Sequence, residues 1–204
     1  MYKKYFKSIL DFLIALIATI VLMPVFIVVY IAIKLESEGP AVFKQARVGK
    51  HGKEFTVYKF RSMVADQSQI KKSSKLYEND PRITRVGSFI RKTSLDELPQ
   101  VFNILKGDMS FIGPRPPVPH FPKRYSEYNN FEQQRFNVKP GISGLAQIRC
   151  REIHDWNINI PIDVEYVNNY SFAYDAKLFL ASLMTFFKHD NIYTSDKAVE
   201  RSGE

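Results

Sequence analysis

Residues 12–33 read FLIALIATIVLMPVFIVVYIAI, and this stretch contains no charged side chain. A helix rises ~1.5 Å per residue and a bilayer core takes ~20 apolar residues, so a helix over this stretch is long enough to enter a membrane. The stretch is longer than the apolar region of a secretory signal peptide, and no small-residue cleavage pattern follows it. We therefore expect residues 1–36 to form a membrane-associated helix.

Two features of the sequence bear on how this helix lies in the membrane. Pro24 falls near its middle, and proline removes a backbone donor and clashes with the preceding turn. Cationic residues flank both ends, and such flanks favour the cytoplasmic side. These features fit a helix–break–helix that enters and leaves on one side, and equally a proline-kinked span. The flanking cations are Lys3, Lys4, Lys7, Lys34, Lys44, Arg47 and Lys50; one interpretation of Arg47 is charge that faces the membrane.

The charge and composition of the chain restrict its partners. The chain has 204 residues, of which 45% are hydrophobic, and its net charge of +8 predicts an anionic partner. Nucleic acid, an anionic membrane face and a phosphorylated substrate all satisfy that prediction. A single cysteine, Cys150, excludes an internal disulfide, and the four histidines are scattered, so we expect no structural zinc site.

Beyond the apolar stretch, local patterns predict an α+β domain over residues 37–188. Strands are expected over 41–47 and 54–63, where apolar residues alternate. Helices are expected over four segments, the last of them amphipathic and suited to a membrane interface. These helices cover residues 84–92, Ser94 to Lys106 with Gly107 as its stop, 121–136 and 176–187.

Polar or Gly/Pro-rich segments connect these elements. Residues 64–82 are polar and are interpreted as a loop, and residues 189–204 as a polar tail. The stretch GDMSFIGPRPPVP at 107–119 is interpreted as a loop, and KPGISG at 139–144 as a turn. The sequence therefore predicts a membrane helix, one domain and a tail.

The acidic pair in TSLDELPQ (93–100) has two interpretations. In the first, Ser94 and Glu97 form a capping box at a helix start, where carboxylates also favour the helix dipole. In the second, the pair is chemical, because Arg91 precedes it and Arg115 follows it. A carboxylate attacks phosphorus when cations neutralise the repulsion, and a second carboxylate is a suitable ligand for Mg²⁺.

Four motifs together decide between these interpretations. They are FKQARVG (43–49), YKFRSM (58–63), RKTSLDELPQVFNILKGDMSFIGPRP (91–116) and KPGISGLAQ (139–147). They resemble those of the bacterial sugar transferases, and most closely the small monotopic phosphoglycosyl transferases. The resemblance extends from the apolar stretch to about residue 175, which is most of the chain.

This resemblance implies a membrane enzyme with a re-entrant helix broken at Pro24. Such an enzyme transfers a sugar phosphate from a UDP-sugar to undecaprenyl phosphate and releases UMP, at the cytoplasmic face of the bacterial inner membrane. The implied nucleophile is Asp96, which forms a covalent phosphosugar intermediate, and Glu97 is the implied Mg²⁺ ligand. The implied substrate- and phosphate-binding residues are Lys59, Arg91, Arg115 and Asp163.

The sequence departs from the family pattern at two places. Met23 stands before the proline, where relatives often have a small hydroxyl residue. After Gln147, an asparagine–glycine–arginine pattern is expected; Arg151 fits it, whereas Arg149 and Cys150 do not. Contacts to the sugar or the nucleotide are expected to differ there. The competing class is a membrane-tethered basic module for nucleic acid or anionic lipid. That class accounts for the charge but not for the 91–116 block, so we expect no nucleic-acid partner.

Overall fold

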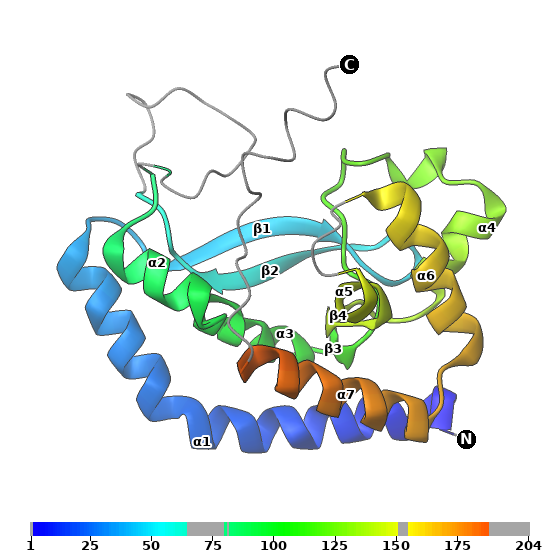
Figure 1. The fold of residues 1–204 in the computed structure, drawn as a ribbon, viewed down its shortest axis with the longest axis horizontal. Coiled ribbons are helices and arrows are strands. Elements are labelled where there is room, and N and C mark those ends of the chain that lie inside the picture. Colours follow the sequence, from blue (N-terminus) through cyan, green and yellow to red (C-terminus); the bar gives the residue numbers. More distant parts are fainter. Residues whose placement is uncertain (1, 65–79, 81, 151–154, 188–204) are drawn as a thin grey trace.

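The N-terminal helix α1 (Lys7–Glu36) is the longest element of the fold, and it continues without interruption through Pro24. The structure, a computed structural model, describes residues 2–64, 80, 82–150 and 155–187. The ribbon of α1 bends part way along its length (Figure 1). The predicted interruption at Pro24 is therefore a bend. Proline frees only the Ile20 carbonyl, and the turns on either side keep their helical geometry.

The exposed surface of α1 is apolar along its length. Ile17, Ile20 and Val28 are each more than 60% exposed. Within the described residues, α1 is the one helix whose length and composition suit it to cross a membrane. Its opposite side packs on the rest of the chain, where Phe26 contacts Phe60 and Phe102. One side of this helix is thus covered by the domain, and the other is available to lipid.

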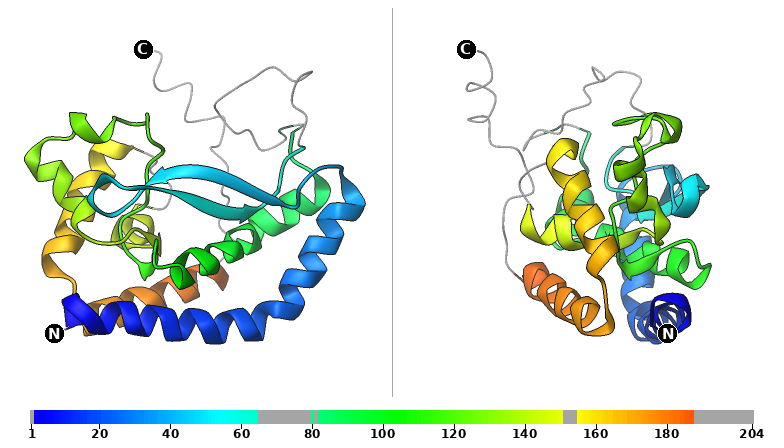
Figure 2. Two further views of the ribbon diagram at one scale, coloured as in Figure 1. Left: turned by 180° about the vertical axis from the view of Figure 1, so that it is seen from behind. Right: turned by 90° about the vertical axis from the view of Figure 1, so that its right-hand side faces the viewer.

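Both ends of α1 are hydrogen-bonded to the same domain. Near its start, Asp11 accepts a hydrogen bond of 2.7 Å from the Ser110 hydroxyl. At its end, Glu36 accepts hydrogen bonds from the backbone N–H groups of Arg85 and Val86, the first residues of helix α2 (Arg85–Lys92). The bend in α1 allows these distant ends to reach one body of the protein (Figure 2).

An antiparallel hairpin of β1 (Val42–Val48) and β2 (Glu54–Phe60) forms the next layer. Its register places Phe43 opposite Lys59 and Arg47 opposite Phe55. Both predicted strands are confirmed: the first is shifted by one residue, and the second begins where predicted and ends three residues earlier. The hairpin is fixed to α3 (Val101–Leu105) by Asn103, which accepts a hydrogen bond from Tyr58 N and donates one to Thr56 O.

A second, parallel strand pair occupies segments for which a loop and a turn were predicted. β3 (Ser110–Ile112) pairs with β4 (Gly141–Ser143), about thirty residues later in the chain. Local composition carries no signal for such distant pairing. A Cβ on Gly141 would lie 2.2 Å from the backbone nitrogen of Gly113, so only glycine permits this approach.

Two of the predicted helices differ from the observed structure. The segment from Ser94 to Lys106 is a 3₁₀ helix, η3 (Leu95–Gln100), followed by α3, because Pro99 and the conformation of Ser94 prevent one regular helix. Gly107 does end it, with a φ of 83°. Residues 121–136 form short pieces rather than one helix: η4 (Tyr125–Glu127), α4 (Asn130–Gln133) and η5 (Gln134–Asn137).

The remaining elements close the fold. The predicted helix 84–92 is confirmed as α2, and helix 176–187 as the C-terminal part of α7 (Phe172–Phe187). Two helices were not predicted; in addition, a π-helical turn precedes α1 and a short 3₁₀ turn follows β1. Residues 65–79, 81 and the tail 189–204 lie outside the described residues. The additional elements are η1 (Tyr2–Phe6), η2 (Lys50–Gly52), α5 (Leu145–Arg149) and α6 (Trp156–Asn169).

Candidate active site

A tight turn presents the acidic pair at the start of η3. Ser94 lies in the left-handed region with a φ of 53°, and its side chain caps no backbone group. The capping-box interpretation of Ser94 and Glu97 is therefore wrong, because Ser94 lies in a conformation that turns the chain and the Glu97 side chain bonds to Lys59. The Ser94 carbonyl instead accepts a hydrogen bond of 3.2 Å from Glu97 N, which closes the turn.

The two carboxylates of the pair have different surroundings. Lys59 on β2 donates to Glu97 Oε1 at 2.5 Å, and both side chains are about a quarter exposed. Asp96 is half-buried beside them. Neighbours in a 3₁₀ helix point about 120° apart, so the two carboxylates face different groups. This agrees with the expectation that they have separate roles.

The same surroundings move the two pKa values in opposite directions. Burial and the adjacent Glu97 raise the pKa of Asp96 to about 6, against the opposing effect of Lys59 and Arg91. Burial would also raise the pKa of Glu97, but Lys59 and Arg115 outweigh it and hold that pKa below its usual range. Glu97 is thus a fixed anion, whereas Asp96 titrates close to neutral pH. Neighbouring carboxyl groups with separated pKa values are typical of active sites.

The loop that carries Arg115 is held in place because four of its consecutive backbone carbonyls accept hydrogen bonds from other elements. Gly141 N donates to Pro114 O at 3.0 Å, and Val48 N donates to Pro117 O at 2.9 Å. Between them, Arg115 O and Pro116 O accept from two arginine side chains, Arg135 at 2.8 Å and Arg47 at 2.9 Å. The backbone of residues 114–117 is therefore fixed, while the Arg115 side chain is exposed.

Asp163 lies on α6 beneath this loop, and it contacts protein rather than open space. It forms an ion pair of 2.6 Å with Arg135, and the two side chains are 2% and 1% exposed. Since Arg135 also donates to Arg115 O, the described contacts of Asp163 position the loop. Direct binding of the substrate by Asp163 stays a prediction.

A depression lies beside the acidic pair. Three cations from different elements line it: Arg47 from β1, Lys59 from β2 and Arg115 from the loop. Glu97 supplies its only carboxylate among the described lining residues. The other lining residues are Val57, Gln100, Pro116, Gly141 and Ile142. A concave surface with several cations and one carboxylate suits a phosphorylated ligand.

The structure brings together most of the predicted site residues. Glu97, Lys59 and Arg115 share the depression, with Asp96 adjacent to Glu97 but not among the lining residues. Arg91 is not among the lining residues: it donates to the Ser62 hydroxyl at 2.7 Å, and its charge acts on Asp96. Arg151, from the departing segment, lies outside the described residues, and its neighbour Arg149 pairs with Glu165 at the surface.

The residues of the site fit an Mg²⁺ ion only with help from a substrate. The described residues contain no group of three or more His, Cys, Asp or Glu side chains placed to hold a metal. Glu97 is ionised, and within the described part of the chain its Oε2 makes no hydrogen bond. Mg²⁺ is commonly held by one or two carboxylates together with substrate phosphates. Glu97 is suitable as that carboxylate.

Sequence reasoning missed two arginines of the site. Arg47 lies within the FKQARVG motif, so the motif itself was a signal for it. Arg135 lies in a segment predicted as a polar helix, and no local pattern distinguishes it. Both act on the same loop from different sides.

Comparison with known proteins identifies the family of this chain. The family profile described as Bacterial sugar transferase matches residues 2–189. A "Galactosyl transferase CpsE" from Streptococcus agalactiae is 47% identical over 156 residues, which cover 71% of this chain and 34% of that protein. An "Uncharacterized sugar transferase EpsL" from Bacillus subtilis is 43% identical over 146 residues, which cover 72% of this chain and 69% of that protein.

A third relative carries a more specific name. The "UDP-N-acetylgalactosamine-undecaprenyl-phosphate N-acetylgalactosaminephosphotransferase" of Aeromonas hydrophila is 41% identical over 184 residues. The match covers 89% of this chain and 43% of that protein. The chain thus spans less than half the length of this relative and of the streptococcal one.

Proposed function

The chain belongs to the bacterial sugar transferase family, and we propose that it is a phosphoglycosyl transferase. In this proposal it transfers a sugar phosphate from a UDP-sugar to undecaprenyl phosphate, at the start of glycoconjugate synthesis on a membrane. The names of relatives support this substrate class, among them the Aeromonas enzyme and a "UDP-glucose:undecaprenyl-phosphate glucose-1-phosphate transferase" of Xanthomonas campestris. The observation that carries the proposal is the Asp96–Glu97 pair beside a depression lined by three cations.

The proposed reaction has two displacement steps at phosphorus. In the first, a carboxylate oxygen of Asp96 bonds to the sugar-bearing phosphorus, and the bond from that phosphorus to the bridging oxygen breaks. UMP leaves with the electron pair. In the second, an oxygen of the lipid phosphate bonds to the same phosphorus and the Asp96 carboxylate leaves. The products are UMP and undecaprenyl diphosphate sugar, and the kinetics are ping-pong.

The surroundings of the acidic pair support this division of roles. A nucleophile with a pKa of about 6 is mostly ionised at neutral pH and is a moderate leaving group in the second step. Lys59 and Arg115 reduce the repulsion between a carboxylate and a diphosphate. Bound Mg²⁺, held by Glu97 and the donor phosphates, would neutralise further charge on the diphosphate.

We further propose that α1 is re-entrant, with both ends at the cytoplasmic face of the inner membrane. The contacts of Asp11 with Ser110 and of Glu36 with α2 support this, because they attach both ends to one domain. α7 runs alongside the N-terminal arm of α1 in Figures 1 and 2, and it exposes Phe172, Leu180 and Met184. These two helices give the domain a common apolar surface for the membrane.

Release of UMP tests the proposed function. Protein in nanodiscs that contain undecaprenyl phosphate is incubated with a panel of UDP-sugars, and UMP is quantified. We expect release with at least one sugar, and a fall of about 10⁴-fold or more for Asp96→Asn. Glu54→Gln, an exposed change on β2, is the control. No release with any sugar, or full activity of Asp96→Asn, would contradict the proposal.

Membrane topology has its own test. A single cysteine is placed near the N-terminus of a Cys150→Ser protein in inner-membrane vesicles of known orientation. The re-entrant arrangement predicts labelling by an impermeant maleimide from the cytoplasmic face alone. Labelling from the periplasmic face would instead indicate a kinked span.

A further inference from the structure

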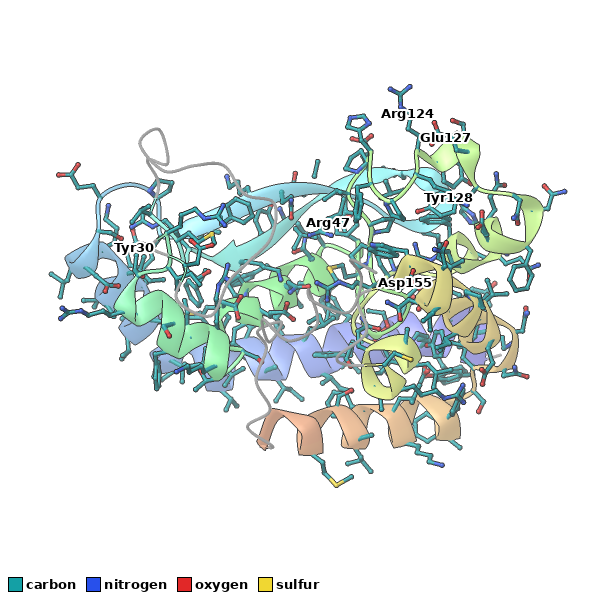
Figure 3. All side chains as sticks on the ribbon, turned by 45° about the horizontal axis from the view of Figure 1, so that its top comes forward. Tyr30, Arg47, Arg124, Glu127, Tyr128 and Asp155 are labelled. Atoms are coloured by element: carbon teal, nitrogen blue, oxygen red, sulfur yellow. The ribbon has the colours of Figure 1, made fainter. Side chains whose placement is uncertain are left out.

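Arg47 is a residue of the depression for which the reaction above gives no role. Its place in FKQARVG among the flanking cations suggested charge that faces the membrane. The structure places it elsewhere: it is half-buried on β1 and lines the depression with Lys59, Glu97 and Arg115. Figure 3 shows Arg47 well separated from Tyr30, which marks the C-terminal arm of α1.

The guanidinium of Arg47 is held only by neutral oxygens. Nη1 donates to Pro116 O at 2.9 Å, and Nε and Nη2 donate to Gln45 Oε1 at 3.2 and 2.7 Å. Among the described residues it forms no ion pair. An arginine carries five N–H donors, so two are left after these three hydrogen bonds. The orientation of the side chain is thus fixed, and two of its N–H donors remain available for a ligand.

The charges around the depression do not balance. Glu97 is already paired with Lys59 at 2.5 Å, which leaves the charges of Arg47 and Arg115 without a carboxylate partner among the lining residues. Burial and the neighbouring Arg115 lower the pKa of Arg47 to about 10, so it remains charged at neutral pH at a cost in free energy. A bound anion would remove that cost.

We propose that Arg47 is a third cationic ligand of the donor diphosphate, oriented by Gln45 and Pro116. This inference rests on the proposed function, since it names the group that the depression binds. Arg47 holds the carbonyl of Pro116, the residue after Arg115, so the Arg47 guanidinium and the backbone that carries Arg115 keep a fixed relation. Planar guanidinium groups suit the paired oxygens of a phosphate.

Binding of inorganic pyrophosphate and of UDP, measured by calorimetry, tests the proposal without turnover. Arg47→Gln is expected to weaken both by about tenfold to a hundredfold, the effect of losing a charge-assisted contact. Arg47→Lys keeps the charge but loses the planar fork and its contacts with Gln45 and Pro116, so it is expected to recover only part of that loss. Lys44→Gln is the matched control, because it removes an equal charge from the other face of the same strand.

The outcomes separate the possible roles of Arg47. Unchanged binding in Arg47→Gln overturns the proposal. Equal losses in Arg47→Gln and Lys44→Gln also overturn it, because the net charge of the strand, and not a contact made by Arg47, would then account for the loss. Should Arg47→Gln fail to fold, the original protein still gives an answer through the arginine reagent phenylglyoxal. Saturating pyrophosphate should slow modification of Arg47, and an unchanged rate contradicts the proposal.

A kinetic arm distinguishes the donor diphosphate from the phosphate of the lipid acceptor. Arg47→Gln should lower kcat/KM for the UDP-sugar and leave kcat/KM for undecaprenyl phosphate unchanged, because ping-pong kinetics separate the two steps. The reverse pattern overturns the assignment to the donor. If the original protein binds pyrophosphate but releases UMP from no UDP-sugar, the proposed function fails while the anion site and its Arg47 ligand stand.

Discussion

Two ion pairs on either side of the Arg115 loop differ in their access to solvent. Arg135–Asp163 is closed, with side chains 1% and 2% exposed, whereas Lys59–Glu97 is open, with side chains 24% and 26% exposed. The closed pair donates a hydrogen bond to the carbonyl of Arg115, and the open pair lines the depression. Two ion pairs of similar composition thus have different roles. The buried pair positions the Arg115 loop, and the partly exposed pair lies at the proposed reaction site.

The difference between the two pairs also explains why the backbone of residues 114–117 is held by so many hydrogen bonds. A phosphate-binding arginine is effective only if it is held where the phosphate lies, since small misplacements reduce the rate strongly. The buried arginine fixes the loop from below, and the backbone of β1 and β4 fixes it from the sides. Stability and catalysis should therefore respond differently to changes in the two pairs.

The largest effect is expected for the closed pair. Asp163→Asn leaves the buried Arg135 without its counter-charge, and breaking a buried pair costs about 3–5 kcal/mol. Denaturant unfolding in detergent measures this cost. Glu165→Gln, at an exposed pair on the same helix, is the control and should cost less than about 1 kcal/mol. Unchanged stability with lost donor binding would instead support direct substrate binding by Asp163.

The open pair should give the opposite pattern. Glu97→Gln is expected to lower kcat for UMP release by about 10²–10³-fold, as for loss of one electrostatic group of an active site. Its cost in stability should be about 1 kcal/mol or less, because the pair is partly exposed. Kinetics and thermal unfolding of the same preparation measure both. A large loss of stability with unchanged kcat would remove the distinction between the pairs.

The pH dependence sharpens the account of the open site. Since the pKa of Asp96 is raised to about 6, kcat/KM for the donor should fall about tenfold per unit below about pH 6. Glu97 should not titrate in that range, because its pKa is lowered. A profile that stays flat down to pH 5 would contradict Asp96 as the titrating nucleophile.

The same pKa shift has a consequence for stability with a definite sign. Between the ordinary value of 3.8 and the shifted value of about 6, the native state holds more protons than the unfolded state. The free energy of unfolding therefore falls as pH rises through that window, and Asp96→Asn removes this loss. We expect Asp96→Asn to melt at a higher temperature than the original protein at pH 7 and at about the same temperature at pH 4.

The smallest effect concerns the turn that presents the open pair. Ser94 has a φ of 53°, which glycine adopts without strain, so Ser94→Gly should stabilise the protein by about 0.5–1 kcal/mol. Ser88→Gly makes the same change inside α2 and should destabilise by a similar amount. Thermal unfolding compares them. Destabilisation by Ser94→Gly would show that the serine side chain has a role in the turn.

The sequence predicted those parts of the fold that depend on local pattern. The hairpin strands, α2 and α7 followed from periodicity. Motifs gave the candidate site residues Asp96, Glu97, Lys59 and Arg115, of which the last three line the depression, while their roles stay predictions. The β3–β4 pair was missed because its two strands meet across about thirty residues of chain. The break expected at Pro24 is a bend, since packing of Phe26 on Phe60 keeps the helix in contact with the domain beyond the proline.

The parts of the site that were missed share one physical cause. Arg47 and Arg135 act on the backbone carbonyls of a distant loop, and although the FKQARVG motif marks Arg47, no spacing pattern in the sequence gives the partner of either arginine. The capping box at Ser94 failed for a related reason. The side chain of Glu97 had two possible partners, and the tertiary partner Lys59 prevailed over the local one.

The covalent intermediate is the central claim of this account, and intact-protein mass spectrometry after rapid acid quenching tests it most directly. Protein incubated with a productive UDP-sugar, without lipid acceptor, is predicted to gain the mass of one phosphosugar, mapped by peptide analysis to Asp96. Addition of undecaprenyl phosphate should remove that mass. A protein that turns over the donor but never carries the adduct, or carries it equally in Asp96→Asn, would contradict the account.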